Sequence, residues 1–283
     1  MTYDLKGVGR EFGQRGHTSV VLRNITLNIA PGEQVALLGP SGSGKTTLFR
    51  LLNGSIFPSS GQLLYRQTNI ATMSHVQLRE MRRKIGFIYQ QHYLVPGMSV
   101  LSNTMSGALG RWGLASTLVN LVHPRPVEVE RAEHCLEAVG LKEKRGFRCD
   151  ELSGGQQQRL AIARTLMQEP EVILADEPVA SLDPVLSHEI LDLLVGLAGE
   201  GHLTLLISLH QVELARRHAQ RIVALRDGEI AFNAPIHELD ESFLDQLYRS
   251  SREPCASPIT EAFPYPAGGN DGADSGQKRP CIR

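Results

Sequence analysis

The sequence predicts an α/β fold in which helices cover a mostly parallel sheet. Three apolar segments, at 35–38, 172–175 and 203–208, are rich in Val, Ile and Leu and do not alternate apolar with polar residues. That pattern is typical of strands buried on both faces of a parallel sheet. A helix is expected at 45–52, directly after the first of these strands, because an Asn-Gly pair at 53–54 ends the apolar spacing.

More exposed strands are expected beside this core. In "SVVLRNITLNIAPGE" apolar and polar positions alternate before a Pro-Gly turn, and "FPSSGQLLY" combines a turn with another such strand. The segment 91–157 differs in texture, and its apolar residues over 127–139 have helical spacing. We therefore expect a helical insertion in the α/β core.

Composition narrows the class of protein. The 283 residues include 29 Lys plus Arg against 30 Asp plus Glu, so we expect no nucleic-acid partner, because such surfaces usually carry a basic stripe. Four scattered cysteines without a C-x-x-C pair predict neither a disulfide framework nor a zinc site and favour a reducing cytosol. No secretory signal opens the chain, and no apolar run approaches the roughly 20 residues that span a bilayer. Any membrane association is expected to come through a partner.

The last segment, 251–283, is crowded with Pro, Gly and Ser. It has too few spaced apolar residues to offset the entropy lost on ordering, so we expect a disordered tail. The folded domain is expected to cover residues 2–250.

A glycine-rich motif, "GPSGSGKT", matches G-x-x-x-x-G-K-[ST] between an expected strand and an expected helix. Its glycines let successive backbone N–H groups face one anion, and the helix adds the positive end of its dipole. Lys45 is expected to neutralise the β- and γ-phosphates of a nucleotide, and the Thr46 hydroxyl to bind Mg²⁺. A chance Gly/Ser-rich turn is the alternative, which the flanking elements disfavour. The predicted phosphate-binding residues are Gly39, Pro40, Ser41, Gly42, Ser43, Gly44, Lys45, Thr46 and Thr47.

An acidic pair ends the apolar segment "VILADE". Asp176 is expected to hold Mg²⁺ through water, and Glu177 to polarise an attacking water as a general base. Many acidic residues at strand ends are merely solvated, and it is the combination with the phosphate loop that makes this pair informative.

A second candidate phosphate site lies in "LSGGQQQR". Ser153 and Gln156 form an S-x-x-Q capping box at the start of an expected helix, and a well-capped helix is the simple interpretation. Two glycines in the first turn, Gly154 and Gly155, each cost roughly 1 kcal/mol relative to Ala. A closely approaching phosphate would explain them. If one nucleotide fills the first loop, a second copy of the chain can grip the same γ-phosphate through a two-fold interface.

In combination these motifs resemble the nucleotide-binding subunit of an ABC transporter, over roughly residues 2–250. The phosphate loop resembles Walker A, "VILADE" Walker B, "LSGGQ" the signature, and "SLDP", which contains Asp183, the D-loop. His210 in "LISLHQ" resembles the switch histidine. Gln90 in "IGFIYQQ" resembles the Q-loop glutamine, although Gln91 is an obvious competitor.

This resemblance implies a P-loop NTPase with a RecA-like core, an antiparallel N-terminal β-subdomain and a helical subdomain inserted at about 91–157. It implies ATP and Mg²⁺ as ligands, with Gln90 touching the metal and the attacking water. It also implies a head-to-tail homodimer that sandwiches ATP, transmembrane permease subunits, an indirectly coupled periplasmic binding protein and a location at the cytoplasmic face of the inner membrane. In such subunits an aromatic residue stacks on adenine; Phe12 is the first choice and Tyr3 the second.

Several longer stretches, among them "LHQVELARRHAQRIVALRDGEI" and "GALGRWGLASTLVNLVHPRP", resemble the ATPase subunit of phosphonate importers, whose relatives handle phosphite. The alternatives are the ATPase of a transporter for another solute, such as a polar amino acid, or of an exporter. A soluble ABC ATPase of DNA repair or translation is disfavoured, because the chain has one cassette and no sustained heptads between Lys45 and Ser153. A P-loop kinase or GTPase is also disfavoured, since no N-K-x-D motif is present.

The stretch "HYLVPGMSV" follows Gln90 and has two interpretations. Its apolar residues could receive a helix of the membrane subunit, or they could be ordinary core. The residues concerned are Leu94, Val95, Met98 and Val100.

Overall fold

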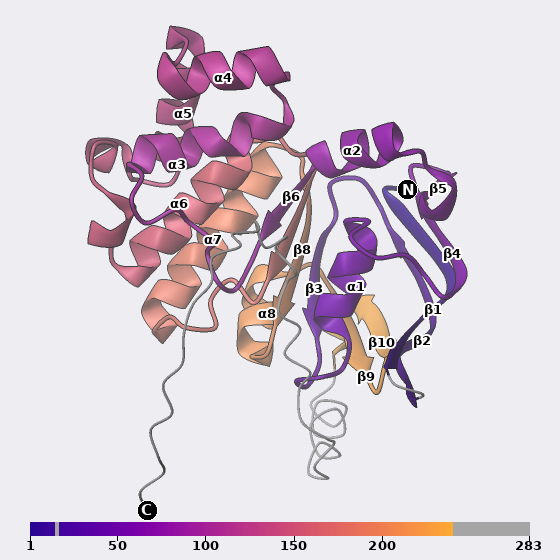
Figure 1. Cartoon of the computed structure of the whole chain (residues 1–283). Helices are drawn as coiled ribbons and strands as arrows, with labels where there is room; N and C mark the ends of the chain where they lie inside the picture. The colour runs from indigo at the N-terminus through magenta and orange to yellow at the C-terminus, as the bar shows by residue number, and fades with distance from the viewer. Residues whose placement is uncertain (15–16, 240–283) are drawn as a thin grey trace, which may run out of the picture. The chain divides into compact units, whose positions relative to one another are not determined.

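A six-stranded sheet forms the centre of the computed structural model, which describes residues 1–14 and 17–239 (Figure 1). Its strand order is β10-β9-β3-β8-β7-β6. All neighbouring pairs are parallel except β9 with β10. The strands are β3 (Gln34–Leu38), β6 (Ile85–Ile88), β7 (Val172–Asp176), β8 (Thr204–Leu209), β9 (Arg221–Arg226) and β10 (Glu229–Pro235).

The three apolar segments of the sequence are β3, β7 and β8, and every residue of these strands is buried. Alternate residues face opposite sides of the sheet. Val35 and Leu37 belong to the apolar cluster that contains α1 (Lys45–Leu52), whereas Ala36 and Leu38 belong to the cluster that contains residues of α6 (Gly154–Met167) and α7 (Pro184–Glu200). The predicted parallel sheet with helices on both faces is therefore correct.

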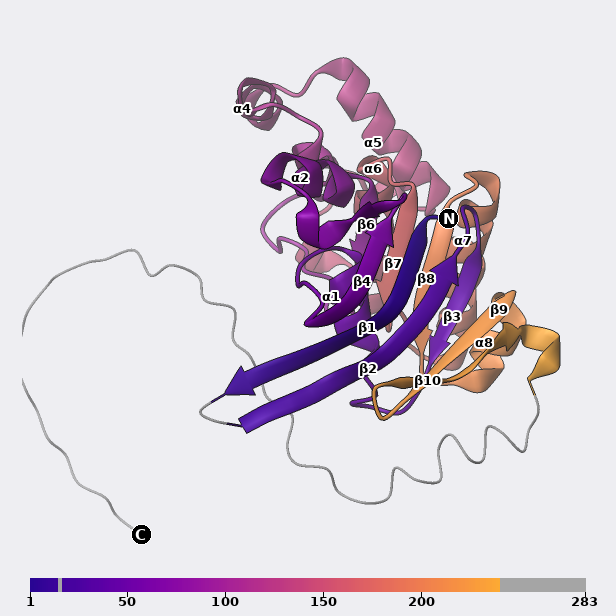
Figure 2. The same cartoon turned by 90° about the vertical axis from the view of Figure 1, so that its right-hand side faces the viewer.

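An antiparallel sheet packs over α1, in the strand order β2-β1-β4-β5 (Figure 2). The exposed strands expected from the sequence belong to it. Tyr3 and Leu5 of β1 share the apolar cluster of Leu48 and Phe49 of α1. The strands are β1 (Tyr3–Gln14), β2 (His17–Ile29), β4 (Ser60–Tyr65) and β5 (Thr68–Asn69), followed by the short turn η1 (Ile70–Thr72) and α2 (His75–Arg83).

A group of helices lies between β6 and β7 in the chain, where the insertion is predicted. The helix expected at 127–139 is α5 (Pro126–Ala138), whose Ala132 packs with Met105 and Met167. The boundaries of the insertion, 91–157, stay a prediction. The other elements of the group are α3 (Val100–Ser106), η2 (Gly107–Gly110), α4 (Leu114–Val122), η3 (Lys142–Lys144) and η4 (Cys149–Glu151), with α6 leading back towards the sheet.

The remaining elements are α8 (Val212–His218) and η5 (Ile236–Glu238). Over residues 1–14 and 17–239, no helix combines the length and the apolar character needed to cross a membrane. The expected disordered tail at 251–283 and the expected domain end at 250 lie outside the described residues.

In the segment after Gln90, some of the apolar residues are core and others lie at the surface. Val100 is fully buried and Leu94 packs against the main apolar cluster, so these two residues are core. Val95 is 47% exposed and Met98 half-buried. Of these four residues, Val95 and Met98 are the ones outside the main apolar cluster and available to a surface that receives another chain.

Candidate nucleotide-binding and catalytic site

Four neighbouring parallel strands end at one edge of the central sheet, and each is followed by predicted site residues. Leu38 of β3 pairs with Leu209 of β8, and Asp176 of β7 pairs with Ser208. Ile88 of β6 pairs with Ala175. Ligands of open α/β sheets bind outside the carboxyl ends of the strands. The residues that meet at this edge are Gly39 after β3, Gln90 near the end of β6, Glu177 after β7 and His210 after β8.

The loop between β3 and α1 has the backbone of an anion cradle. Gly39, Gly42 and Gly44 have φ of 149°, 81° and 105°. A Cβ at Gly39 would lie 2.3 Å from the Leu225 carbonyl oxygen, while one at Gly42 would meet nothing within 4 Å. The loop is therefore packed on the protein side and open on the side of Gly42, where a phosphate can approach the backbone.

The start of α1 offers unsatisfied donors to this loop. Gly44 occupies the N-cap position and supplies no side-chain acceptor, so the first-turn N–H groups lack a capping side chain. The buried Ser43 hydroxyl has no hydrogen-bond partner within the described chain. These orphaned donors fit the phosphate groups of a nucleotide. The predicted Pro40, Ser41 and Thr47 lie in the same loop and first turn, with Ser41 exposed.

Lys45 folds back across the loop that precedes it. Its Nζ donates to the carbonyl oxygens of Gly39, at 2.8 Å, and of Pro40, at 3.1 Å. The residue is only 5% exposed, and this burial lowers the pKa of the ammonium, an effect that Glu177 and Asp176 partly oppose. A buried cation with so little anionic compensation favours the arrival of a phosphate.

Asp176, the last residue of β7, is buried and points towards two hydroxyl groups. Its Oδ1 accepts a hydrogen bond from Ser208 Oγ at 2.7 Å. Burial raises the pKa of this carboxyl, while hydrogen bonds from Ser208 and Thr46 hold the pKa down. The sequence predicts Asp176 and Thr46 as partners at one metal, and these two side chains do lie together.

The donor set fits Mg²⁺, which prefers oxygen ligands and usually keeps phosphate and water in its shell. Over the described ranges, no group of three or more His, Cys, Asp or Glu side chains could hold a metal. The Thr46 hydroxyl and the Asp176 carboxylate are two oxygen donors that lie together here and would suit such an ion. Gln90, the third predicted ligand, lies exposed two residues after β6.

Glu177 turns the chain out of the sheet in a left-handed conformation, with φ of 50°. Its backbone N–H donates to Ser208 Oγ at 2.8 Å. Its carboxylate Oε1 lies 2.5 Å from His210 Nε2 and 4.0 Å from Lys45 Nζ. The two residues predicted as catalytic are therefore in direct contact, next to Lys45, which is predicted to bind phosphate.

Ser153 and Gln156 form the predicted capping box at the start of α6. Ser153 Oγ accepts from the Gln156 N–H at 3.4 Å, and the Ser153 N–H donates to Gln156 Oε1 at 3.2 Å. The two glycines differ, however. A Cβ at Gly155 would lie 2.3 Å from Leu186 Cδ2 of α7, whereas one at Gly154 would meet nothing. Packing of α6 on α7 therefore also favours a glycine at position 155, whereas the backbone at Gly154 is open to an approaching group.

Asp183, in the segment that resembles the D-loop, caps α7. Its carboxylate accepts from the Leu186 N–H at 3.0 Å. Leu186 is also the residue that packs on Gly155, so the starts of α6 and α7 support one another.

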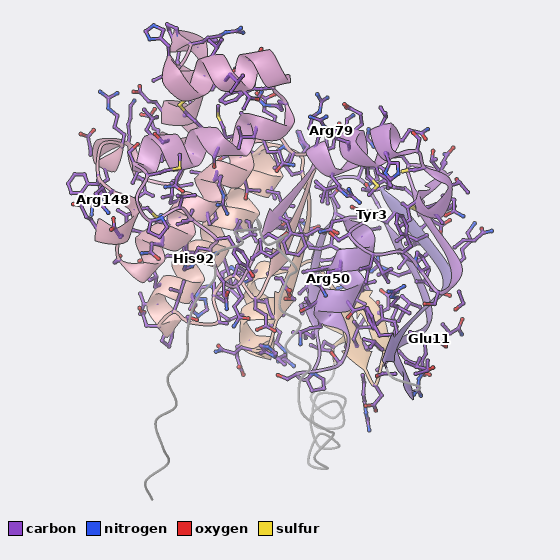
Figure 3. All side chains as sticks on the ribbon, in the orientation of Figure 1. Tyr3, Glu11, Arg50, Arg79, His92 and Arg148 are labelled. Atoms are coloured by element: carbon purple, nitrogen blue, oxygen red, sulfur yellow. The ribbon has the colours of Figure 1, made fainter. Side chains whose placement is uncertain are left out.

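Phe12 and Tyr3 have different environments on β1. Phe12 is partly exposed, and the Arg10 guanidinium lies 4.5 Å from its ring centroid. Tyr3 is fully buried, with its ring 5.4 Å from that of Tyr65 (Figure 3). The second choice for the adenine-stacking residue, Tyr3, is therefore wrong, because its ring is enclosed in the core under the antiparallel sheet.

Two residues of this region escape sequence analysis. Ser208 forms hydrogen bonds with both Asp176 and Glu177. In the sequence it stands out only as a polar residue near the end of an apolar strand. Arg164 of α6 donates to the carbonyl oxygens of His92, at 2.7 Å, and Tyr93, at 2.6 Å. It thereby fixes the segment that follows Gln90 to the helix that begins at the signature.

Comparison with known proteins, like the geometry of the phosphate loop, points to a nucleotide-binding protein. Residues 22–180 match the family described as ABC transporter. The chain belongs to this family. It is 47% identical to the "Phosphonates import ATP-binding protein PhnC" of Frankia casuarinae, over 87% of this chain and 95% of that protein. It is 44% identical to the protein of the same name from Wolinella succinogenes, over 81% of this chain and 82% of that protein.

Solved ABC structures have the same fold. A structure described as "Dimeric Structure of MJ0796, a Bacterial ABC Transporter Cassette" superposes with a TM-score of 0.73 and 32% identity, covering 84% of this chain and 100% of that one. A second structure of that cassette is described as a dimer in a post-hydrolysis state bound to ADP and Pi. The chain is accordingly an ABC ATPase with a P-loop NTPase fold.

Proposed function

We propose that this chain is the ATP-hydrolysing subunit of an importer for phosphonates and related phosphorus oxyanions such as phosphite. The observation that carries the proposal is its 47% identity, over nearly the whole of both chains, to a protein named for phosphonate import. A second relative at 44% identity carries the same name. The transported solute is not expected to touch this subunit, so the support comes from these relatives and not from a pocket.

ATP would lie on the phosphate loop with its triphosphate towards Lys45. The Lys45 ammonium, which now donates to loop carbonyl oxygens, neutralises charge on the β- and γ-phosphates. The Thr46 hydroxyl and the Asp176 carboxylate hold Mg²⁺, which when bound stabilises the charge that develops on the phosphates. Phe12 stacks on adenine with the ring face that Arg10 does not cover.

Glu177 acts as the general base that accepts a proton from the attacking water. His210 contacts the Glu177 carboxylate and orients it, and it also senses the γ-phosphate from its place after β8. Gln90, at the end of β6, helps to position the water and the metal. These roles follow from the common edge at which the four strands end.

The second half of the site would come from a second copy of the chain. Ser153, Gly154 and Gln156 of one subunit grip the γ-phosphate held by the other, and the two Asp183 loops meet between the sites. Closure on ATP and reopening after hydrolysis drive permease subunits at the cytoplasmic face of the inner membrane, and a periplasmic binding protein delivers the solute to them. Val95 and Met98, beside Gln90, contribute to the contact with the permease.

Deletion of the gene in its host tests the transported class. The deletion strain should fail to grow on methylphosphonate as the sole phosphorus source and grow normally on inorganic phosphate. Expression of the wild-type chain should restore growth, and expression of the Glu177→Gln variant should not. Unchanged growth of the deletion strain on methylphosphonate and phosphite would contradict this assignment.

A further inference from the structure

Ser208 occupies an unusual position in the central sheet. It is fully buried near the end of β8, in a strand whose other residues from 205 to 209 are apolar. In the parallel ladder it pairs with Asp176 of the neighbouring strand. A buried hydroxyl is retained at such a place only when it has partners, because burying it without them is costly.

The hydroxyl has two partners, and their chemistry fixes the direction of both hydrogen bonds. The Glu177 N–H can only donate, so Ser208 Oγ accepts this bond at 2.8 Å. The single hydroxyl proton then goes to Asp176 Oδ1, at 2.7 Å. One side chain therefore holds a carboxylate oxygen of Asp176 and the backbone of the next residue, Glu177.

The bond to Glu177 coincides with a strained backbone. Glu177 adopts φ of 50°, a left-handed conformation that residues with a Cβ rarely take. The turn carries the Glu177 carboxylate to His210 and towards Lys45. Such a conformation persists only where the surroundings enforce it, and the Ser208 hydroxyl is the acceptor provided for the Glu177 N–H.

We propose that Ser208 is a positioning residue that aligns the metal-binding Asp176 and the general base Glu177 with one hydroxyl group. The proposal rests on the ATPase role of the site and not on the transported solute. Ser208 is fully buried, and its hydroxyl bonds to Asp176 and to the backbone of Glu177. It acts by keeping the two acidic residues in the relative orientation that metal binding and proton abstraction both require.

The test compares full-length wild type with Ser208→Ala and Ser208→Thr, since threonine keeps the hydroxyl. Thr204→Val is the matched control. It removes another buried hydroxyl of β8, one that accepts from the Gly32 N–H at 3.0 Å at the opposite end of the strand. Thermal unfolding of each nucleotide-free protein checks that the variants fold.

Three measurements distinguish positioning from a general packing role. In nucleotide-free protein, hydrogen exchange at the Glu177 amide should speed up about tenfold or more in Ser208→Ala and stay slow in Ser208→Thr. Metal-free ATP should bind Ser208→Ala within about twofold of wild type, while the gain in affinity on adding Mg²⁺ should fall severalfold. The kcat of ATP hydrolysis should fall about tenfold or more in Ser208→Ala and recover in Ser208→Thr, with Thr204→Val unaffected in all three.

Wild-type exchange, Mg²⁺ response and kcat in Ser208→Ala would overturn the proposal. It would also be overturned if Ser208→Thr failed to restore these properties in a folded protein, or if Thr204→Val lost them equally. Failure of phosphonate-dependent growth is a separate result, because it would change the assigned solute and leave these ATPase measurements untouched.

Discussion

The Nε2 atom of His210 lies 2.5 Å from Oε1 of Glu177. The two residues follow neighbouring strands of the parallel sheet, β8 and β7, and are brought together by the register that pairs Asp176 with Ser208. The same carboxylate oxygen is 4.0 Å from Lys45 Nζ. The residues proposed as general base, orienting imidazole and phosphate-binding cation thus form one contiguous group.

Replacement of Glu177 by Gln should remove the general base while keeping the shape of the side chain. We expect kcat to fall roughly 10²–10⁴-fold, with ATP affinity within about threefold of wild type. Radiolabelled ATP turnover and equilibrium ATP binding measure the two quantities. His210→Ala should reduce kcat less, since it removes the group that orients the base and not the base itself. Normal turnover in Glu177→Gln would remove Glu177 from this role.

A Ser153→Arg variant should separate ATP binding from hydrolysis. The arginine would block the signature turn, which is expected to act on the nucleotide of the other subunit, so binding to a single chain should be preserved and hydrolysis abolished. Ser74→Arg is the matched control, because Ser74 and Gln77 form the same capping box at the start of α2. That variant should lose a similar helix cap, worth about 1 kcal/mol, and still hydrolyse ATP. An equal loss of binding and hydrolysis in Ser153→Arg would count against the split site.

The buried carboxylate of Asp176 should destabilise the folded, nucleotide-free protein at neutral pH. Burial raises the pKa of its carboxyl above the usual value, so the folded state is penalised once pH exceeds the unfolded pKa and the carboxylate ionises inside the protein. Asp176→Asn should therefore raise Tm at pH 7.5 by a few degrees. The gain should persist down to the folded pKa and disappear as pH falls from the folded pKa to the lower, unfolded pKa. Glu130→Gln, at an exposed position of α5, should leave Tm unchanged. A lower Tm for Asp176→Asn at pH 7.5 would mean that the hydrogen bonds from Ser208 and Thr46, together with the attraction to Lys45, outweigh the cost of burial.

Phe12 should contribute to nucleotide affinity through stacking. Phe12→Ala should weaken ATP binding about 5–150-fold, because stacking of a base on an aromatic ring is worth about 1–3 kcal/mol, whereas Phe12→Trp should preserve it. Fluorescence titration with a labelled ATP analogue measures the effect. If Phe12→Ala binds ATP like wild type, the stacking residue lies elsewhere, and it is not the buried Tyr3.

Local sequence patterns were sufficient to predict much of the fold and many residues of the candidate site. The helix expected at 45–52 begins and ends at those residues in the structure, because a glycine-rich turn and an Asn-Gly pair bracket it in the sequence. The three buried strands are marked by continuous apolar runs. What these patterns could not show are contacts between distant segments. Ser208 meets Glu177 across 31 positions, and Arg164 meets Tyr93 across 71.

Contacts between distant segments also explain why the sequence misleads at Tyr3 and gives an incomplete picture at Gly155. Tyr3 looks available in the sequence, but its side chain is enclosed between β1, β4 and the core beneath them. Gly155 stays a predicted phosphate-binding glycine, and the structure adds a packing neighbour, Leu186 of α7, that the sequence does not show. No local sequence pattern predicts the residues that enclose Tyr3, and none predicts that Leu186 packs on Gly155.

The central claim is that one ATP is held between two copies of the chain, and the molecular mass of the Glu177→Gln variant with Mg²⁺ and ATP tests it most directly. Light scattering coupled to size-exclusion chromatography should give about twice the 31.1 kDa of one chain with ATP, and a single chain without it. Adding Ser153→Arg should abolish the dimer while ATP stays bound. A monomer that retains ATP in the variant with an intact Ser153 would contradict the account.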